Sequence, residues 1–225
     1  RSADTASRLR AAAAAIQRQN ASLVEANREL RRRSASALEG LSATVDARDE
    51  YTAGHSRRVR DLAVEIGREL GLGERDLDAL GTAALFHDIG KLAVPDAILL
   101  KPGPLDPEEW EVMRAHPAES ARIVSRLGHL SDSVPAIRHH HERYDGGGYP
   151  DGLAGEEIPL GARIIHVADA VDAMLSPRTY RGARTVLQTI AELERCAGGQ
   201  LCPDAVAAAR RVLRRRSVVP ARLAV

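Results

Sequence analysis

The sequence predicts an all-α protein, in which a helical bundle follows a long N-terminal helix with coiled-coil character. Aromatic residues make up only 3% of the chain, whereas Ala, Leu, Val and Arg are abundant, which suits helices better than a β-sandwich. No segment shows the strict alternation of apolar and polar residues that is typical of a strand. Apolar residues instead recur at helical spacing, and the chain contains no Gly or Pro before Gly40.

The N-terminal helix is expected over residues 1–45. Its first seam repeats every seven residues, at Leu9, Ile16, Leu23 and Leu30, and its second follows four residues later, at Ala13, Asn20, Asn27 and Ser34. Such heptads are typical of a parallel coiled coil, where Asn in a seam weakens the dimer but sets its register. We therefore expect a homodimer through this helix, which would pass on signals from an upstream sensor domain absent from this chain. The alternative is a single surface helix with a chance repeat.

Two helices are expected next. Residues 57–70 carry an apolar stripe that ends at Gly71, and glycine is typical of the position just after a helix. Residues 74–88 predict a second helix, which stops at Gly90. Its end therefore coincides with a His-Asp pair.

The second half of the chain begins with a strong helix start. Asp106 can cap the helix, Pro107 suits its first position, and Glu109 completes a capping box. This helix should kink or restart at Pro117. Further helices are expected at about 133–142, 161–175, 184–196 and 203–215. Residues 143–160 are too rich in Gly and Pro for a regular element.

Bulk properties narrow the class of protein. The chain of 225 residues suits one full domain with some extra length, and its net charge of +1 argues against a general DNA binder. Cys196 and Cys202 show no metal-ligand pattern and are expected to be packing residues in a reducing compartment. No apolar run approaches the roughly 20 residues needed to span a bilayer, and no signal peptide is recognised. We therefore expect a cytoplasmic location.

Two motifs carry the functional information. One is His87-Asp88-Ile89-Gly90-Lys91, and the other is the stretch HHERYDGGGYP at residues 140–150. Together they resemble the HD-GYP family, metal-dependent hydrolases of cyclic dinucleotides such as cyclic di-GMP, and the resemblance runs from about residue 49 to residue 206. It implies an HD-type helical bundle, with a signalling and dimerisation helix at 1–45 and a phosphohydrolase domain at 46–225.

The resemblance also implies a metal site. The family's ligand positions fall on His55, His87, Asp88, His116, His140, His141 and Asp169. By this likeness, Asp88 bridges two divalent transition-metal ions; one ion also takes His55, His87 and Asp169, and the other His116, His140 and His141. Imidazole and carboxylate, with no thiolate, suit Fe or Mn but do not distinguish them. Taken alone, each residue has a simpler explanation as a cap or a surface charge.

One position departs from the family. Some members use a Glu four residues before the first histidine to bind a third ion, and this chain has Tyr51 there. We therefore expect two ions. Asp172 is expected to support the site rather than bind metal, and His166 either orients a ligand or simply packs.

Catalytic and substrate-binding roles follow from the same resemblance. Asp88 and Lys91 are the expected catalytic residues, and Lys91, Tyr149, Arg178 and Arg181 the expected substrate contacts. Arginine suits phosphate because its guanidinium donates paired hydrogen bonds. The simpler explanations are a solvated lysine, a Tyr-Pro turn and exposed arginines.

The function expected from these residues is hydrolysis of a 3′–5′ bond of cyclic di-GMP to linear pGpG, with GMP as a further product. One alternative is a catalytically silent module that binds a cyclic dinucleotide or a GGDEF-type partner. Another is a hydrolase of a different cyclic dinucleotide, because base preference cannot be derived from these motifs.

Overall fold

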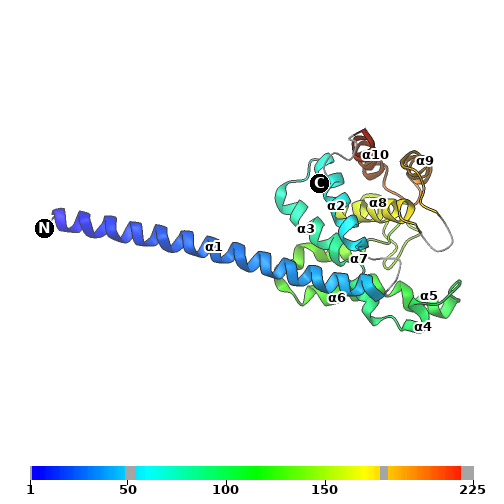
Figure 1. Cartoon of the computed structure of the whole chain (residues 1–225), viewed down its shortest axis with the longest axis horizontal. Coiled ribbons are helices and arrows are strands. Elements are labelled where there is room, and N and C mark those ends of the chain that lie inside the picture. The colour runs from blue at the N-terminus through cyan, green and yellow to red at the C-terminus, as the bar shows by residue number, and fades with distance from the viewer. Residues whose placement is uncertain (1, 49–53, 178–181, 219–225) are drawn as a thin grey trace, which may run out of the picture. The chain divides into compact units, whose positions relative to one another are not determined.

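The structure of the protein is a computed structural model that describes residues 2–48, 54–177 and 182–218. Contacts divide the chain into two compact units, residues 1–41 and residues 42–225 (Figure 1). The described residues form ten α-helices and three 3₁₀ helices without a strand, so the all-α prediction is confirmed. No described helix has the length and apolarity needed to cross a membrane.

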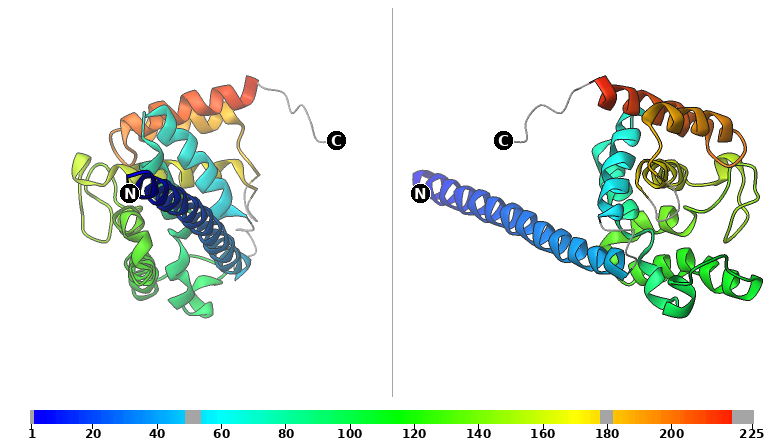
Figure 2. Two further views of the ribbon diagram at one scale, coloured as in Figure 1. Left: turned by 90° about the vertical axis from the view of Figure 1, so that its left-hand side faces the viewer. Right: turned by 45° about the vertical axis from the view of Figure 1, so that its right-hand side comes forward.

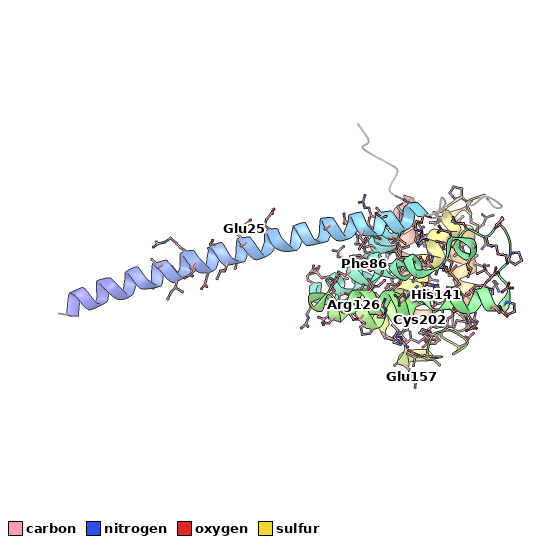
Figure 3. The ribbon with its side chains drawn as sticks, turned by 90° about the horizontal axis from the view of Figure 1, so that it is seen from below. Glu25, Phe86, Arg126, His141, Glu157 and Cys202 are labelled. Atoms are coloured by element: carbon pink, nitrogen blue, oxygen red, sulfur yellow. The ribbon has the colours of Figure 1, made fainter. Side chains whose placement is uncertain are left out.

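Helix α1 (Ser2–Arg48) supplies all of the described part of the first unit. The predicted seam residues Ile16 and Leu23 are 59% and 62% exposed. In Figure 3 the side chain of Glu25 projects from this helix. The side chains of Leu9 and Leu30 lie outside the described residues. The helix itself is confirmed, and its pairing into a coiled coil stays a prediction, as does the domain boundary at residue 45.

The core of the second unit forms around α8 (Leu160–Leu175). This helix contacts α2 (His55–Glu69), α3 (Glu74–Phe86), α7 (Val134–Arg138), α9 (Val186–Cys196) and α10 (Pro203–Val218) (Figure 2). The predicted stripe of α2 is buried, with Val59 and Ile66 fully inaccessible to solvent. Phe86, at the end of α3, lies inside the same bundle (Figure 3). Apolar burial at helical spacing therefore brings segments far apart in sequence onto one helix.

The connection between α3 and α7 contains shorter elements. A 3₁₀ helix (Ile89–Ala93) and α4 (Asp96–Leu99) come first, followed by α5 (Pro107–Arg114) and α6 (His116–Ser125). The predicted capping box is present, because the Asp106 side chain accepts from the Glu109 N–H and the Glu109 side chain accepts from the Asp106 N–H. The predicted restart at Pro117 is confirmed, since α6 begins one residue earlier.

Helix α7 is shorter than predicted. It was expected over 133–142 but ends at Arg138, after a 3₁₀ helix (Gly128–Ser133). The Nδ1 atom of His140 lies 2.7 Å from the carbonyl oxygen of Ile137, and this hydrogen bond competes with continuation of the helix. His140 and His141 therefore lie in a turn. The predicted irregular segment 143–160 contains a short 3₁₀ helix (Gly155–Glu157) and, at its last residue, the start of α8.

The start of α2 is capped from α1. The residue before α2 is Gly54, which has a φ of 70° and no side chain to cap the helix. The buried Asp46 supplies the cap, because its carboxylate accepts from the Ser56 N–H at 3.2 Å and from the Ser56 hydroxyl at 2.7 Å. This contact fixes the segment that carries His55.

We predict that Asp46→Ala lowers the free energy of unfolding by about 1–3 kcal/mol, because it removes the cap and leaves a buried hydroxyl without its acceptor. Urea unfolding measures the change. The control is Asp61→Ala, in which an exposed carboxylate of α2 is removed, with an expected change within about 0.5 kcal/mol. Equal effects of the two substitutions would contradict the capping role.

Candidate metal centre

The His-Asp pair lies where α3 ends. His87 is still helical, with φ −54° and ψ −35°, whereas Asp88 leaves the helix at φ −100° and ψ 2°. Both residues are buried. The change of backbone direction lets the side chains of these two neighbours reach one buried site.

Three histidine rings are held in the same way. The Nδ1 atoms of His87, His116 and His140 each lie 2.7–2.8 Å from the carbonyl oxygen three residues earlier in the chain. Because a carbonyl only accepts, Nδ1 carries the proton and Nε2 keeps its lone pair. This tautomer is the one that ligates a metal through Nε2.

The fourth ring, that of His55, is held by a carboxylate. Its Nδ1 donates to Asp172 Oδ2 at 2.8 Å, and the Arg58 guanidinium donates to both oxygens of Asp172. Burial alone would lower the pKa of His55, but the hydrogen bond to Asp172 and the nearby charge of Asp169 raise it. Asp172 thus orients His55 through a hydrogen bond to Nδ1, in the supporting role that the sequence predicted.

The free side of these rings points at Asp88. Its Oδ1 lies 3.2 Å from His116 Nε2 and 4.0 Å from His140 Nε2, and its Oδ2 lies 3.5 Å from His87 Nε2. Among the described residues, these three Nε2 atoms and Asp88 Oδ1 are buried and make no hydrogen bond. A lone pair facing a carboxylate oxygen at this distance is unfavourable unless a cation lies between them. The donors therefore fit a divalent metal ion.

Two groups of donors share Asp88. Its carboxylate lies with His55 and His87 in one group and with His116, His140 and His141 in the other, and the donor atoms of each group lie within 4.8 Å of one another. The cluster could hold metal. This division of the histidines is the one expected from the family resemblance.

Asp169, the remaining predicted ligand, lies at one edge. Its Oδ1 is 3.4 Å from His55 Nε2, and its side chain is 27% exposed. It belongs to neither of the two tight groups. The structure therefore brings Asp169 to the cluster beside His55 but outside the two tight groups that contain Asp88.

Burial and nearby charges keep three of the donors in the form that binds metal. Burial lowers the pKa of His140 well below its usual value and that of His141 to about 3. Burial would raise the pKa of Asp88, but the Lys91 ammonium and the other nearby groups hold it well below its usual range. At neutral pH the imidazoles of His140 and His141 are therefore neutral, and the Asp88 carboxylate is ionised.

Two of the predicted catalytic and substrate residues, Lys91 and Tyr149, lie beside this cluster. Lys91 Nζ donates to Asp88 Oδ2 at 2.6 Å, so the lysine reaches the site as predicted. The Tyr149 ring stacks on His141, with 4.9 Å between ring centroids. The predicted contacts Arg178 and Arg181, and the departure at Tyr51, lie outside the described residues.

Sequence reasoning missed the role of Glu142. Its buried carboxylate accepts from the N–H groups of Asp151 and Gly152, at 2.7 and 3.0 Å, and so ties the glycine-rich loop to the histidine turn. His166 Nδ1 donates to the Glu142 carbonyl oxygen at 2.9 Å, which supports the same turn. No pattern in the sequence indicates this tether, because it depends on the burial of the Glu142 carboxylate.

Gly90 allows α6 to approach the motif. A Cβ atom at this position would lie 2.1 Å from the His116 carbonyl oxygen and 2.6 Å from the Ser120 N atom. The Ser120 hydroxyl donates to the His87 carbonyl oxygen at 2.7 Å and accepts from the Gly90 N–H at 2.8 Å. The close contact brings His116 to Asp88.

Comparison with known proteins identifies the family. The model of the HD domain matches residues 39–203, which is most of the chain. The chain belongs to the HD domain family. This finding confirms the resemblance that the two sequence motifs indicated.

Relatives in this family carry informative names. The cyclic di-GMP phosphodiesterase response regulator RpfG of Xanthomonas campestris pv. campestris is 41% identical over 76% of this chain and 46% of its own length. The 3′3′-cGAMP-specific phosphodiesterase 3 of Vibrio cholerae is 42% identical over 75% of this chain and 37% of its own length. The chain thus spans less than half of each of these relatives.

A solved structure has the same fold. The protein Bd1817 from Bdellovibrio bacteriovorus, described as an HDG"Y"P protein, aligns with a TM-score of 0.58 at 22% identity, over 71% of this chain and 51% of its own. At this identity the likeness concerns the fold, and it supports the HD-type bundle.

We predict that Gly90→Ala reduces the bound metal to less than half and lowers the free energy of unfolding by about 1–3 kcal/mol, because the added methyl group pushes α6 and His116 away from Asp88. Elemental analysis and urea unfolding measure the two effects. The control is Gly128→Ala, where a Cβ would meet nothing within 4 Å. A Gly90→Ala protein with unchanged metal content would contradict this role.

Proposed function

We propose that the chain is a metal-dependent phosphodiesterase that hydrolyses a 3′–5′ bond of cyclic di-GMP to linear pGpG, with GMP as a further product. The observation that carries the proposal is the pair of buried donor groups that share Asp88, with their Nε2 atoms directed at its carboxylate. The names of the relatives support the class of substrate.

Two divalent ions are the proposed cofactors. His55, His87 and Asp169 would hold one ion, His116, His140 and His141 the other, and Asp88 would contribute to both. The ligands are imidazoles and carboxylates without a thiolate, which favours Fe or Mn among the first-row metals. When bound, such ions stabilise charge on phosphate oxygens and make water a better nucleophile at neutral pH.

The protein's own residues bind and orient the substrate in this proposal. Asp88 is kept ionised by its surroundings and belongs to both donor groups. Lys91 is close enough to Asp88 to place a positive charge beside a phosphate oxygen. Tyr149, stacked on His141, forms the adjoining wall. Arg178 and Arg181 are proposed as further phosphate contacts from the sequence alone.

A second candidate substrate is 3′3′-cGAMP, because the Vibrio cholerae relative is named for this compound. A silent binding module remains the alternative from another class. A receptor without turnover would not need a complete set of donors, and all seven predicted ligands are present in the sequence. The hydrolase therefore has the stronger support.

We predict that the chain loaded anaerobically with Fe²⁺ or Mn²⁺ converts cyclic di-GMP to pGpG, and that chelation abolishes turnover. Asp88→Asn should lower kcat by about a hundredfold or more, because even groups behind a metal ligand contribute 10–100-fold. The control is Asp132→Asn, an exposed carboxylate paired with Arg75. Liquid chromatography measures the product.

Tight binding of cyclic di-GMP without any product would favour the silent module. Full activity of Asp88→Asn would contradict the proposed role of that carboxylate. Elemental analysis of the protein as purified identifies the metal.

For regulation, we propose that α1 pairs with a second copy of the chain as a parallel coiled coil and transmits changes from an upstream sensor domain. The exposed seam residues Ile16 and Leu23 support the pairing. The last turns of α1 also contact the segments that carry predicted ligands. The Ser42 hydroxyl donates to the Leu85 carbonyl oxygen, near His87, and Asp46 accepts from the Ser56 hydroxyl, next to His55. A GGDEF-type cyclase domain is a further proposed partner, on the family resemblance alone.

Sedimentation tests the coiled coil. The chain should be a dimer at micromolar concentration, and both removal of residues 1–40 and the pair Ile16→Glu with Leu23→Glu should give a monomer, because charges in the seams repel across the dimer. Val24→Glu is the matched control, since Val24 is equally exposed at 62% but lies outside both seams. A monomeric full chain, or a monomeric Val24→Glu variant, would contradict the proposed pairing.

A further inference from the structure

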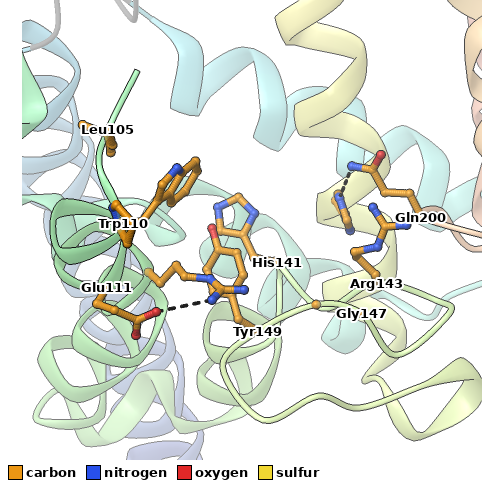
Figure 4. Close-up of a pocket in the computed structure, with 12 residues that line it drawn as sticks. Leu105, Trp110, Glu111, His141, Arg143, Gly147, Tyr149 and Gln200 are labelled. Atoms are coloured by element: carbon orange, nitrogen blue, oxygen red, sulfur yellow. Dashed lines mark hydrogen bonds and ion pairs between the residues drawn. The ribbon is translucent and has the colours of Figure 1, made fainter. Parts of the chain in front are cut away.

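A cavity of about 570 Å³ opens beside the metal centre. Its lining includes Trp110, Glu111 and Arg114 from α5, together with His141 and Tyr149. In Figure 4, Trp110 and Glu111 lie on one side of the cavity, Arg143 and Gln200 lie on the other, and His141 and Tyr149 stand between them. The volume is in the range of pockets that hold small ligands.

A row of side chains connects the metal centre with α5. His141 belongs to one donor group, and its ring stacks on Tyr149. The guanidinium carbon of Arg114 lies 5.0 Å from the centroid of the Tyr149 ring, on the α5 side. Arg114 Nη1 in turn lies 3.5 Å from Glu111 Oε1. A ligand that reaches His141 with a phosphate group can therefore extend along this row toward α5.

Trp110 has the properties of a stacking platform. It is the single tryptophan of the chain, and 47% of its surface is exposed, whereas large apolar side chains of the described core are buried. The indole lines the cavity and does not fill the bundle. An exposed aromatic face at a nucleotide-sized cavity suits a base, because base–aromatic stacking contributes about 1–3 kcal/mol per base.

Glu111 adds a requirement on the base. Its carboxylate only accepts hydrogen bonds, and its side chain is 76% exposed at the cavity next to Trp110. The Watson–Crick edge of guanine carries two adjacent donors, N1–H and the N2 amino group, which a carboxylate can accept together. The corresponding edge of adenine carries an acceptor at N1, which a carboxylate repels.

We propose that α5 forms a guanine subsite in which Trp110 stacks on the base and Glu111 accepts hydrogen bonds from its N1–H and N2 amino groups. The proposal rests on the proposed function, since it assigns base preference to the same site. It makes Trp110 and Glu111 specificity-determining residues, with Arg114 holding the carboxylate in place.

A binding measurement tests the subsite without turnover. GMP and AMP are titrated into the metal-loaded chain while the fluorescence of Trp110, the single tryptophan, is recorded. GMP should quench the fluorescence at about tenfold lower concentration than AMP, and Glu111→Gln should reduce this preference to about twofold or less, because a neutral amide accepts more weakly than a carboxylate. Glu108→Gln, at an exposed position of α5 that does not line the cavity, should keep the preference.

Turnover gives the second arm. Glu111→Gln should lower kcat/KM for cyclic di-GMP about tenfold and leave that for cyclic di-AMP and for bis(p-nitrophenyl) phosphate, an ester without a base, within twofold. A chain that hydrolyses none of these compounds but retains the GMP preference would overturn the proposed function and support the subsite. Equal quenching by GMP and AMP, or an equal loss in Glu111→Gln and Glu108→Gln, would overturn the subsite.

Discussion

The structure depends on one electrostatic constraint, the convergence of buried imidazole lone pairs on the Asp88 carboxylate. Side chains alone do not favour this arrangement, because an unprotonated nitrogen and a carboxylate oxygen repel each other and both lose water on burial. Cations between them reverse the sign of the interaction. Several tertiary contacts hold the chain in place around Asp88. Gly90 lies against the His116 carbonyl group, and the Ser120 hydroxyl hydrogen-bonds to the backbone of both His87 and Gly90.

Backbone hydrogen bonding solves the problem of orientation. His87, His116 and His140 each use Nδ1 to bind a carbonyl three residues earlier, so each ring is fixed by its own turn of chain and presents Nε2 to the centre. His55 lies at the start of α2 and is fixed by Asp172 of α8 instead. These hydrogen bonds therefore have two effects: they compete with continuation of the helix, and they orient the donor nitrogens.

The surroundings of the centre divide the proposed work of binding. In this proposal Lys91 and the donors would bind the phosphate, whereas the cavity toward α5 offers aromatic and carboxylate groups that suit a base. A net charge of +1 gives the chain no general attraction to nucleic acid, so recognition of a small anion has to come from such local groups. The glycine-rich loop, tied down by Glu142, forms part of the wall between the two regions.

The sequence by itself determined the all-α class, the capping box at Asp106 and the restart at Pro117, because helical periodicity and caps are local signals. The list of expected metal ligands came from the resemblance of its motifs to the HD-GYP family. The sequence placed the end of α7 too late, since the hydrogen bond that His140 makes to the Ile137 carbonyl depends on burial of the ring. It could not reveal that Asp46 caps α2, that Glu142 holds the loop, or that Trp110 faces a cavity beside His141. Only the tertiary structure decided these three features. Each depends on contacts between different segments of the chain, and such contacts leave no periodic pattern in the sequence.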